Sequence, residues 1–242
     1  MGESRRRHIA ACFVPVAWLG TNMGYTLNFS AVWRSFDQLL WGLLLSLELA
    51  IGAILIGAVI GLVTAFGLIS KSGWARRPAA LYVTVIRNLP ILVLILFSYF
   101  ALPQMGVRLG KIESFVATLA IYSGAYLAEV FRAGLLSIPN GLKEAGLAIG
   151  LTPMQIRTSI VIPLMFRNVL PSLSSTLISL FKDTSLAAAI AVPELTFEAR
   201  KINVETFRVV ETWIVASCLY VATCTVLAAL MRMVERRLVI SR

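Results

Sequence analysis

The sequence has few charged residues and no long polar stretch. Only 14% of its 242 residues are charged, whereas about a quarter is usual in a soluble domain. Hydrophobic residues make up 58% of the chain, and a chain this short cannot hide so much apolar surface from water. The composition therefore favours an integral membrane protein over a soluble domain.

Histidine and cysteine are also scarce, which limits the possible chemistry. His8 is the only histidine, so neither a His-rich metal site nor a Ser-His triad can form. Cys12, Cys218 and Cys224 are odd in number and lie in apolar surroundings, which indicates buried thiols. No G-x-x-x-x-G-K-[ST] phosphate loop occurs. We therefore expect no catalytic residue, metal or cofactor in this chain.

The chain is basic, with a formal net charge of +10. Some basic chains bind nucleic acid. Here Lys and Arg lie mostly beside the apolar segments, as charges that flank membrane spans do. We expect contact with membrane lipid and none with nucleic acid.

Five apolar segments are long enough to cross a bilayer, which takes about 20 residues. They predict an all-α membrane domain of about five transmembrane helices, at residues 39–69, 79–101, 115–136, 170–192 and 212–231. Gly57 and Gly61 lie four apart in the first segment. They either allow close approach of another helix or reflect the high glycine content of membrane spans.

The distribution of Lys and Arg predicts the orientation. The side with residues 137–168 and the C-terminus carries more of these residues, provided that the N-terminal tail is left out. We place that loop and the C-terminus in the cytoplasm. Residues 1–27 are uncertain: they belong to a sixth span or to an extended start, and the membrane domain covers residues 28–242.

The longest connection, residues 137–168, contains signals for helix ends. Asn140 is placed to cap a helix over residues 143–149, and Gly150 is placed to end it. The apolar residues of this helix pack either against a partner or against the spans of the chain itself.

A second helix is predicted directly after Gly150. Thr152 and Gln155 form a capping box, with Pro153 at the first helical position. This helix would run towards Pro163. The loop is thus expected to form two short helices joined by a tight turn.

The fourth apolar segment contains two adjacent charges, Lys182 and Asp183. A charge at the centre of a span costs about 2.5–3.5 kcal/mol on insertion scales and usually faces a bundle interior or an aqueous cavity. The alternative is a structural ion pair, with Asp183 bound to Arg87 or Lys182 bound to Glu129. We favour a transport pathway over this alternative.

The loop resembles that of a known family. Glu144-Ala145-Gly146, then Gly150 and Ile162-Pro163, resemble the "EAA…G…I-x-P" loop of ABC importer permeases. Gly146 replaces the usual second Ala, and the Ile-to-Pro spacing is compressed. Other stretches over residues 28–240 resemble the polar amino acid permease branch, namely IRNLPILVLILFSYFALP, SGAYLAEVFRAGLLSIPNG and KDTSLAAAIAVPEL.

The resemblance implies a permease with the type I ABC importer fold, located in the bacterial cytoplasmic (inner) membrane. A second permease subunit, identical or related, would complete the pathway. Separate ABC ATPase subunits would bind ATP and Mg and dock on the cytoplasmic loop, and an extracytoplasmic solute-binding protein would deliver a polar amino acid. The implied coupling residues are Glu144, Ala145, Gly146, Gly150, Ile162 and Pro163.

An amino acid substrate suggests roles for the charges in the spans. Its ammonium and carboxylate need one group of each sign, so Asp183 would bind the ammonium and Lys182 or Arg87 the carboxylate. Further candidates in the pathway are Thr184, Ser185, Tyr126 and Glu129. Glu129 also lies three residues before Arg132, a spacing typical of an ordinary intrahelical ion pair.

The alternative function is a self-sufficient secondary transporter or channel. It needs no ATPase, but it leaves residues 144–162 without a task. The sequence does not identify the amino acid.

Overall fold

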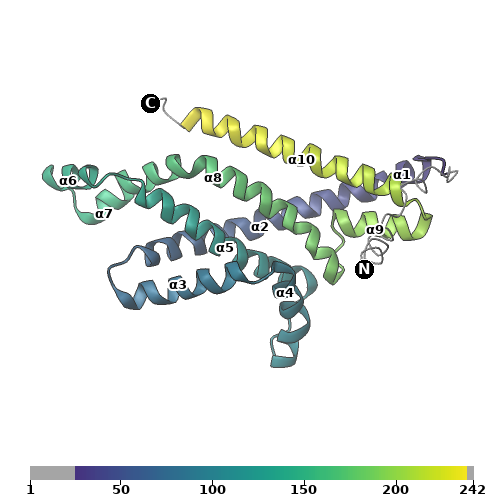
Figure 1. Ribbon diagram of the computed structural model, residues 1–242, viewed down its shortest axis with the longest axis horizontal. Helices are drawn as coiled ribbons and strands as arrows, with labels where there is room; N and C mark the ends of the chain where they lie inside the picture. Colours follow the sequence, from purple (N-terminus) through teal and green to yellow (C-terminus); the bar gives the residue numbers. More distant parts are fainter. Residues whose placement is uncertain (1–24, 239–242) are drawn as a thin grey trace, which may run out of the picture.

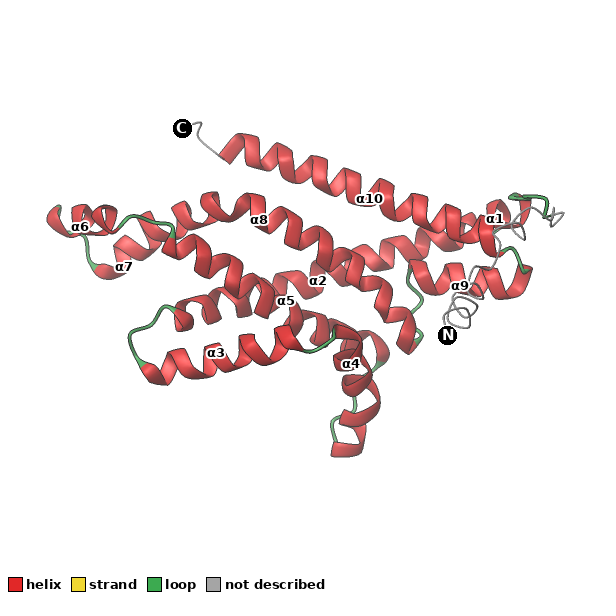
Figure 2. Cartoon of the chain, viewed as in Figure 1, coloured by secondary structure: helices red, strands yellow, loops and turns green. Residues whose placement is uncertain are grey.

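The computed structural model describes residues 25–238, and within them every regular element is helical (Figures 1 and 2). The uncertain tail, residues 1–27, lies almost wholly outside this part. Four helices of the described chain are long and apolar enough to cross a membrane, and one bent pair could provide a fifth span. The predicted all-α architecture is confirmed, and its long helices are α2 (Phe36–Leu68), α5 (Lys111–Leu136), α8 (Ile162–Asp183) and α10 (Val209–Leu238).

The second predicted span is broken. Instead of one helix over residues 79–101, the chain forms α3 (Gly73–Asn88) and α4 (Ile91–Leu96), with a bend of 101° at the break. Proline disfavours a helical conformation in the residue before it and has no amide hydrogen to donate. Leu89, just before Pro90, is accordingly extended, with ψ 136°. The chain then continues as a π-turn, η2 (Phe97–Ala101), and a 3-10 turn, η3 (Leu102–Met105).

The fourth predicted span is longer than expected. The second loop helix, α7 (Pro153–Ile156), passes through a π-turn, η4 (Arg157–Val161), directly into α8. The prediction that it is a separate short helix is therefore wrong. Pro163 falls in the first turn of α8, where a missing amide hydrogen is tolerated, so the helical path does not stop there.

The first loop helix, α6 (Asn140–Ala148), ends as predicted but does not begin as predicted. Pro139 occupies its N-cap, Asn140 is already helical and no side chain caps the first turn. At the other end, Gly150 has a positive φ of 83°. Its amide donates to the carbonyl of Leu147, and the next amide donates to that of Gly146. The capping box of Thr152 and Gln155 is present.

Glycines allow α2 and α5 to pack closely. A Cβ at Gly57 would lie 1.9 Å from the Ser123 hydroxyl oxygen, and one at Gly61 would lie 2.9 Å from the Gly124 carbonyl oxygen. Contacts this short leave no space for a side chain. The close-approach interpretation of these two glycines is therefore correct, and this helix pair forms the centre of the bundle.

We expect Gly61→Ala to destabilise the protein. The new methyl group would overlap backbone atoms of α5, which cannot move as a side chain does, and overpacking of this kind costs about 1–3 kcal/mol. Gly52→Ala is the matched control on the same helix, because a Cβ there has no neighbour within 4 Å. Thermal unfolding of the purified protein in detergent should show a lower Tm for Gly61→Ala alone. Equal Tm values would contradict this packing.

Two helices were not predicted, α1 (Ser30–Arg34) and α9 (Leu195–Thr206). Both lie at the end of the bundle opposite to α6 and α7 (Figure 1). They pack with α2 and α10 around buried Val32, Leu195 and Ile202. This end of the protein is a packed core and not a solvated loop.

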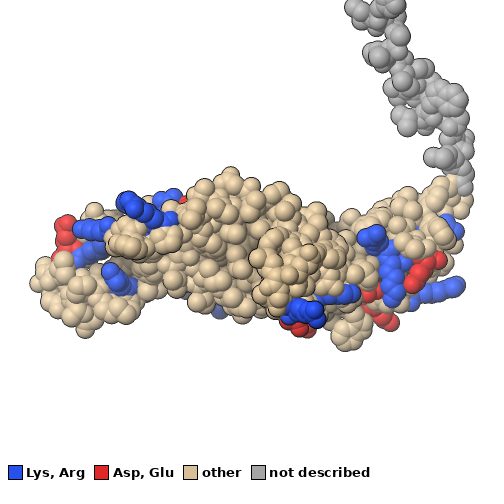
Figure 3. All heavy atoms as spheres, turned by 90° about the horizontal axis from the view of Figure 1, so that it is seen from below, with Lys and Arg blue, Asp and Glu red and all other residues tan. Residues whose placement is uncertain are grey.

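Charge gathers towards the two ends of the elongated body (Figure 3). The face shown there is largely uncharged in its middle part, as expected for a surface that contacts lipid. The predicted burial of cysteine is wrong for Cys218 of α10, which is exposed, while Cys224 is half-buried. An apolar sequence around a residue does not distinguish a protein core from a lipid-facing surface, because lipid tails are equally apolar.

Candidate transport pathway and coupling loop

The helix that carries the charged pair changes its geometry at that pair. α8 ends at Asp183 and continues as a 3-10 segment, η5 (Thr184–Ile190), which closes on Ala191 with a positive φ of 56°. The Thr184 hydroxyl is buried and donates to the carbonyl of Phe181 at 2.7 Å. Thr184 thus stabilises the end of α8, and its hydroxyl is not among the groups that line the cavity described next.

Asp183 lines a cavity of about 240 Å³ between α5 and α8. The Tyr122 and Tyr126 hydroxyls, from α5, lie 3.0 Å apart on one side. The α8 side carries Asp183 and three hydroxyl residues, Ser175, Thr176 and Ser179. Six of the seven lining residues are polar, within a helix pair that is otherwise mainly apolar.

The three α8 hydroxyl residues were not among those predicted from the sequence. Ser175 and Ser179 precede Asp183 at successive intervals of four residues, and such residues share one face of a helix. Both side chains are exposed in the single chain. This polar spacing within an apolar segment was the signal that could have predicted the face.

The cations have different positions relative to this cavity. The Arg87 guanidinium carbon lies 5.2 Å from the centroid of the Tyr126 ring, a cation–π contact at the side of the cavity. Lys182 is exposed and does not line the cavity. Within residues 25–238 no ion pair joins Asp183 to Arg87 or Lys182 to Glu129, so the structural ion-pair alternative does not form.

Glu129 does not contribute to the cavity. Its carboxylate accepts from Arg132 at 3.0 Å (Nε) and 2.7 Å (Nη2), one turn along α5. The carboxylate is therefore already neutralised, and the ordinary intrahelical pair is the correct interpretation. Ser185, in η5, is half-buried and also lies outside the lining.

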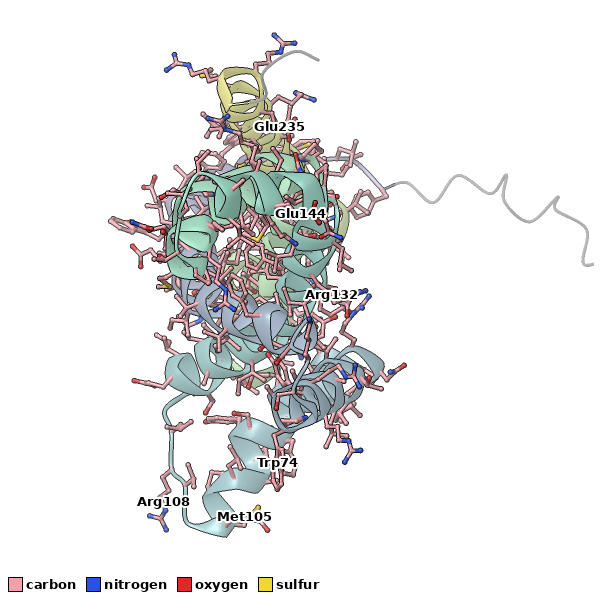
Figure 4. The ribbon with its side chains drawn as sticks, turned by 90° about the vertical axis from the view of Figure 1, so that its left-hand side faces the viewer. Trp74, Met105, Arg108, Arg132, Glu144 and Glu235 are labelled. Atoms are coloured by element: carbon pink, nitrogen blue, oxygen red, sulfur yellow. The ribbon has the colours of Figure 1, made fainter. Side chains whose placement is uncertain are left out.

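The residues implied in coupling lie on different faces of α6 and at the start of α8. Glu144 and Ala145 are exposed, and Glu144 lies at the end of the bundle that faces the viewer in Figure 4. Gly146 is buried, and a Cβ there would lie 3.0 Å from Cγ1 of Ile156. The small size of Gly146 therefore allows α6 to pack on α7. Ile162 and Pro163 begin α8.

A buried carboxylate lies at the opposite end of the bundle. Glu194, which is 0% exposed, caps α9 by accepting from the amides of Thr196 and Phe197, each at 2.9 Å. Ser46 of α2 and Tyr220 of α10 also donate to it, at 3.3 and 3.0 Å. Burial raises the pKa of Glu194 to about 7, against the effect of these donors. Although Glu194 directly follows Pro193 in a polar stretch of sequence, its side chain joins three helices.

The described residues contain no group of three or more His, Cys, Asp or Glu side chains that could hold a metal ion. The polar groups in and beside the α5–α8 cavity can interact with an organic solute through hydrogen bonds and charge. They comprise one carboxylate, hydroxyl groups and a nearby guanidinium.

Comparison with known families shows the family of the chain. A family model described as the inner membrane component of binding-protein-dependent transport systems matches residues 53–240. The chain belongs to this family. It is thus a multi-pass membrane permease with the fold of the ABC importers.

Curated relatives match the permease over nearly its whole length. The glutamine transport system permease protein GlnP of Escherichia coli (strain K12) is 37% identical over 214 residues, which is 87% of this chain and 97% of that protein. The L-cystine transport system permease protein TcyB of Bacillus subtilis (strain 168) is 34% identical over 226 residues, 93% of this chain and 95% of that protein.

A solved structure agrees with these matches. The permease superposes on a chain from the crystal structure of an amino acid ABC transporter with histidines, with a TM-score of 0.81 and 30% sequence identity. The match covers 88% of this chain and all of that chain. The recognition of an ABC importer permease from its sequence is confirmed.

Proposed function

We propose that this permease forms one half of the membrane pathway for a polar amino acid. The observation that carries the proposal is the cavity between α5 and α8, which brings together the Asp183 carboxylate and several hydroxyls, with the Arg87 guanidinium of α3 packed on the lining residue Tyr126. A free amino acid has one ammonium and one carboxylate, which match these two charges in sign. Both curated relatives described above are named as transporters of amino acids, which supports this substrate class.

In this arrangement Asp183 binds the ammonium and Arg87 binds the carboxylate. Arg87 is preferred over Lys182, because the Arg87 guanidinium packs on the ring of Tyr126, which lines the cavity, whereas Lys182 has no such contact with a lining residue. The Tyr122–Tyr126 pair and the α8 hydroxyls supply hydrogen bonds to the rest of the solute.

A second permease subunit completes the pathway. The cavity of about 240 Å³ is smaller than the roughly 300–1,000 Å³ usual for ligand pockets. The exposed Ser175 and Ser179 side chains extend its polar face outward, where a polar group in contact with lipid would be costly. A facing subunit, identical or related, would cover them.

The chain carries no ATPase of its own in this proposal. Separate ABC ATPase subunits bind ATP and Mg and dock on the exposed face of α6, and an extracytoplasmic solute-binding protein delivers the amino acid. The competing function, a self-sufficient transporter or channel, has no comparable support from the relatives.

The test is transport by the purified complex in proteoliposomes, using a panel of labelled amino acids. Uptake should require ATP and the binding protein, whereas uptake without either would overturn the proposal.

The proposed orientation places α6, α7 and the end of α10 in the cytoplasm. These elements lie at one end of the bundle, opposite to α9, which agrees with their predicted grouping on one side (Figure 1). Single cysteines at Gly106 and Asn140, in a background without the native cysteines, should react with an impermeant thiol reagent from opposite sides of the membrane. Reaction of both with reagent added outside would contradict this orientation.

A further inference from the structure

A second, much larger cavity lies outside the candidate pathway. It has a volume of about 1050 Å³ and lies where the end of α2 and the start of α3 meet the coupling loop. Its walls come from α2, the α2–α3 turn, α3, α6, α7 and η4. Neither the pathway nor the exposed face of α6 accounts for it.

The lining combines an apolar wall with a basic rim. Val63, Phe66 and Ile156 are among the apolar residues, while Lys71 from the α2–α3 turn and Arg157 from η4 contribute positive charge. Lys143 of α6 adds a third cation, and no Asp or Glu lines the cavity. Within residues 25–238 none of these three cations forms an ion pair with protein. The cavity therefore suits an occupant with an anionic group attached to an apolar body.

The position of the cavity indicates where that occupant comes from. α2 ends at Leu68 and α3 begins at Gly73, so the turn between these two helices lies at the edge of the apolar part of the bundle. Val63, on the wall, is 69% exposed, and Trp74, beside the rim, is 93% exposed (Figure 4). Exposed tryptophan is typical of the membrane interface. The cavity is thus open to the leaflet at the coupling-loop end.

We propose that this cavity binds an anionic phospholipid. Its phosphate would lie between Lys71, Lys143 and Arg157, and the first part of its acyl chains would lie along the apolar wall. Basic pockets between transmembrane helices on the cytoplasmic side are known to suit such headgroups. A soluble phosphate would use the cations but would have no need of the apolar wall. The bound lipid would contact α6 through Lys143 and so connect lipid composition to the coupling loop.

The test measures lipid binding to the intact transporter complex in detergent by native mass spectrometry. Phosphatidylglycerol, which is anionic, should bind more tightly than phosphatidylethanolamine, which has no net charge. The double variant Lys71→Gln, Arg157→Gln should bind phosphatidylglycerol about 30-fold more weakly, since a cation near an anionic surface contributes about 1 kcal/mol and 1.4 kcal/mol corresponds to tenfold. Lys143 is left unchanged because it lies on the coupling helix.

Matched variants separate the cavity from general surface charge. Arg236→Gln, Arg237→Gln removes two exposed cations from the end of α10, at the same end of the bundle but outside the cavity, and should leave binding within about twofold. Ala75→Trp keeps every charge and fills part of the cavity, so it should weaken binding. Excess inorganic phosphate should not displace the lipid.

Three results would overturn the proposal. The first is equal phosphatidylglycerol binding by the wild type and the Lys71→Gln, Arg157→Gln variant, and the second is displacement of the lipid by inorganic phosphate. The third is a structure of the complex in which the second permease subunit fills this cavity. None of these measurements depends on the substrate, so the outcome is independent of the proposed pathway.

Discussion

Asp183→Asn is expected to abolish most transport while leaving insertion and assembly intact. The substitution keeps the shape of the side chain and removes the negative charge that we assign to the substrate ammonium. A hydrogen bond to a charged group contributes about 1.5–3 kcal/mol, so the affinity of the pathway for substrate should fall by roughly 10- to 100-fold. Asp183 makes no ion pair within the described residues. Removing its negative charge therefore leaves no Lys or Arg side chain of that part of the chain without a former ion-pair partner.

Uptake of labelled amino acids by the reconstituted complex measures this effect. The control is Asp37→Asn, which changes the only other aspartate of the chain, an exposed residue in the first turn of α2. The control should transport like the wild type. Stimulation of ATP hydrolysis by loaded binding protein should persist in both variants, because the coupling loop is unchanged. Wild-type uptake by an assembled Asp183→Asn complex would show that Asp183 is not in the pathway.

Gly150→Val is expected to uncouple ATP hydrolysis from transport. Gly150 has a φ of 83°, and a β-branched residue is a genuine outlier there. A Cβ at this position has no neighbour within 4 Å, so the cost arises from the backbone alone and is about 1–3 kcal/mol. The chain would relieve it by turning α6 away from α7. The exposed Glu144 and Ala145 would then no longer match the ATPase surface.

Gly150→Asn is the matched control, because asparagine is the non-glycine residue that most readily takes a left-handed conformation at a helix end. The measurement is ATP hydrolysis by the reconstituted complex, with and without loaded binding protein. Gly150→Val should lose stimulation and transport, and Gly150→Asn should keep most of both. If both variants are stimulated like the wild type, the turn at Gly150 does not determine coupling.

The sequence predicted the long helices well but not their interruptions. Length and hydropathy are sufficient to locate α2, α5 and α10, because any helix that crosses a bilayer must be long and apolar. The same criterion joined α3 to α4, since the break at Leu89 and Pro90 lies within an apolar run. The separation of α7 from α8 had another cause, because Pro163 suggested a helix end. In the structure the chain passes from α7 through the π-turn η4 into α8 without ending the helical path.

The candidate site was predicted only in part. Charges within apolar segments drew attention to Asp183, Arg87 and Glu129, but the sequence does not show which side chains already have partners. Glu129 is neutralised by Arg132, whereas Asp183 forms no ion pair within the described residues. Likewise, Glu194 follows a proline in a polar stretch and resembles a surface residue. Its burial follows from the packing of α2, α9 and α10, which local sequence does not encode.

Because α7 continues through η4 into α8, a movement at one end of this helical stretch can be transmitted to the other end. The helical stretch from Pro153 to Asp183 has the proposed ATPase contact close to one end and, at the other, the Asp183 carboxylate that we assign to the substrate ammonium. At 1.5 Å per residue it is about 46 Å long, so a tilt of only about 5° around one end displaces the other by about 4 Å. If the stretch moves as one rigid body, a small rotation imposed at its α7 end displaces Asp183 far enough to break or form a hydrogen bond. The π-turn η4 and Pro171 are the two points within it at which the helical path could bend instead.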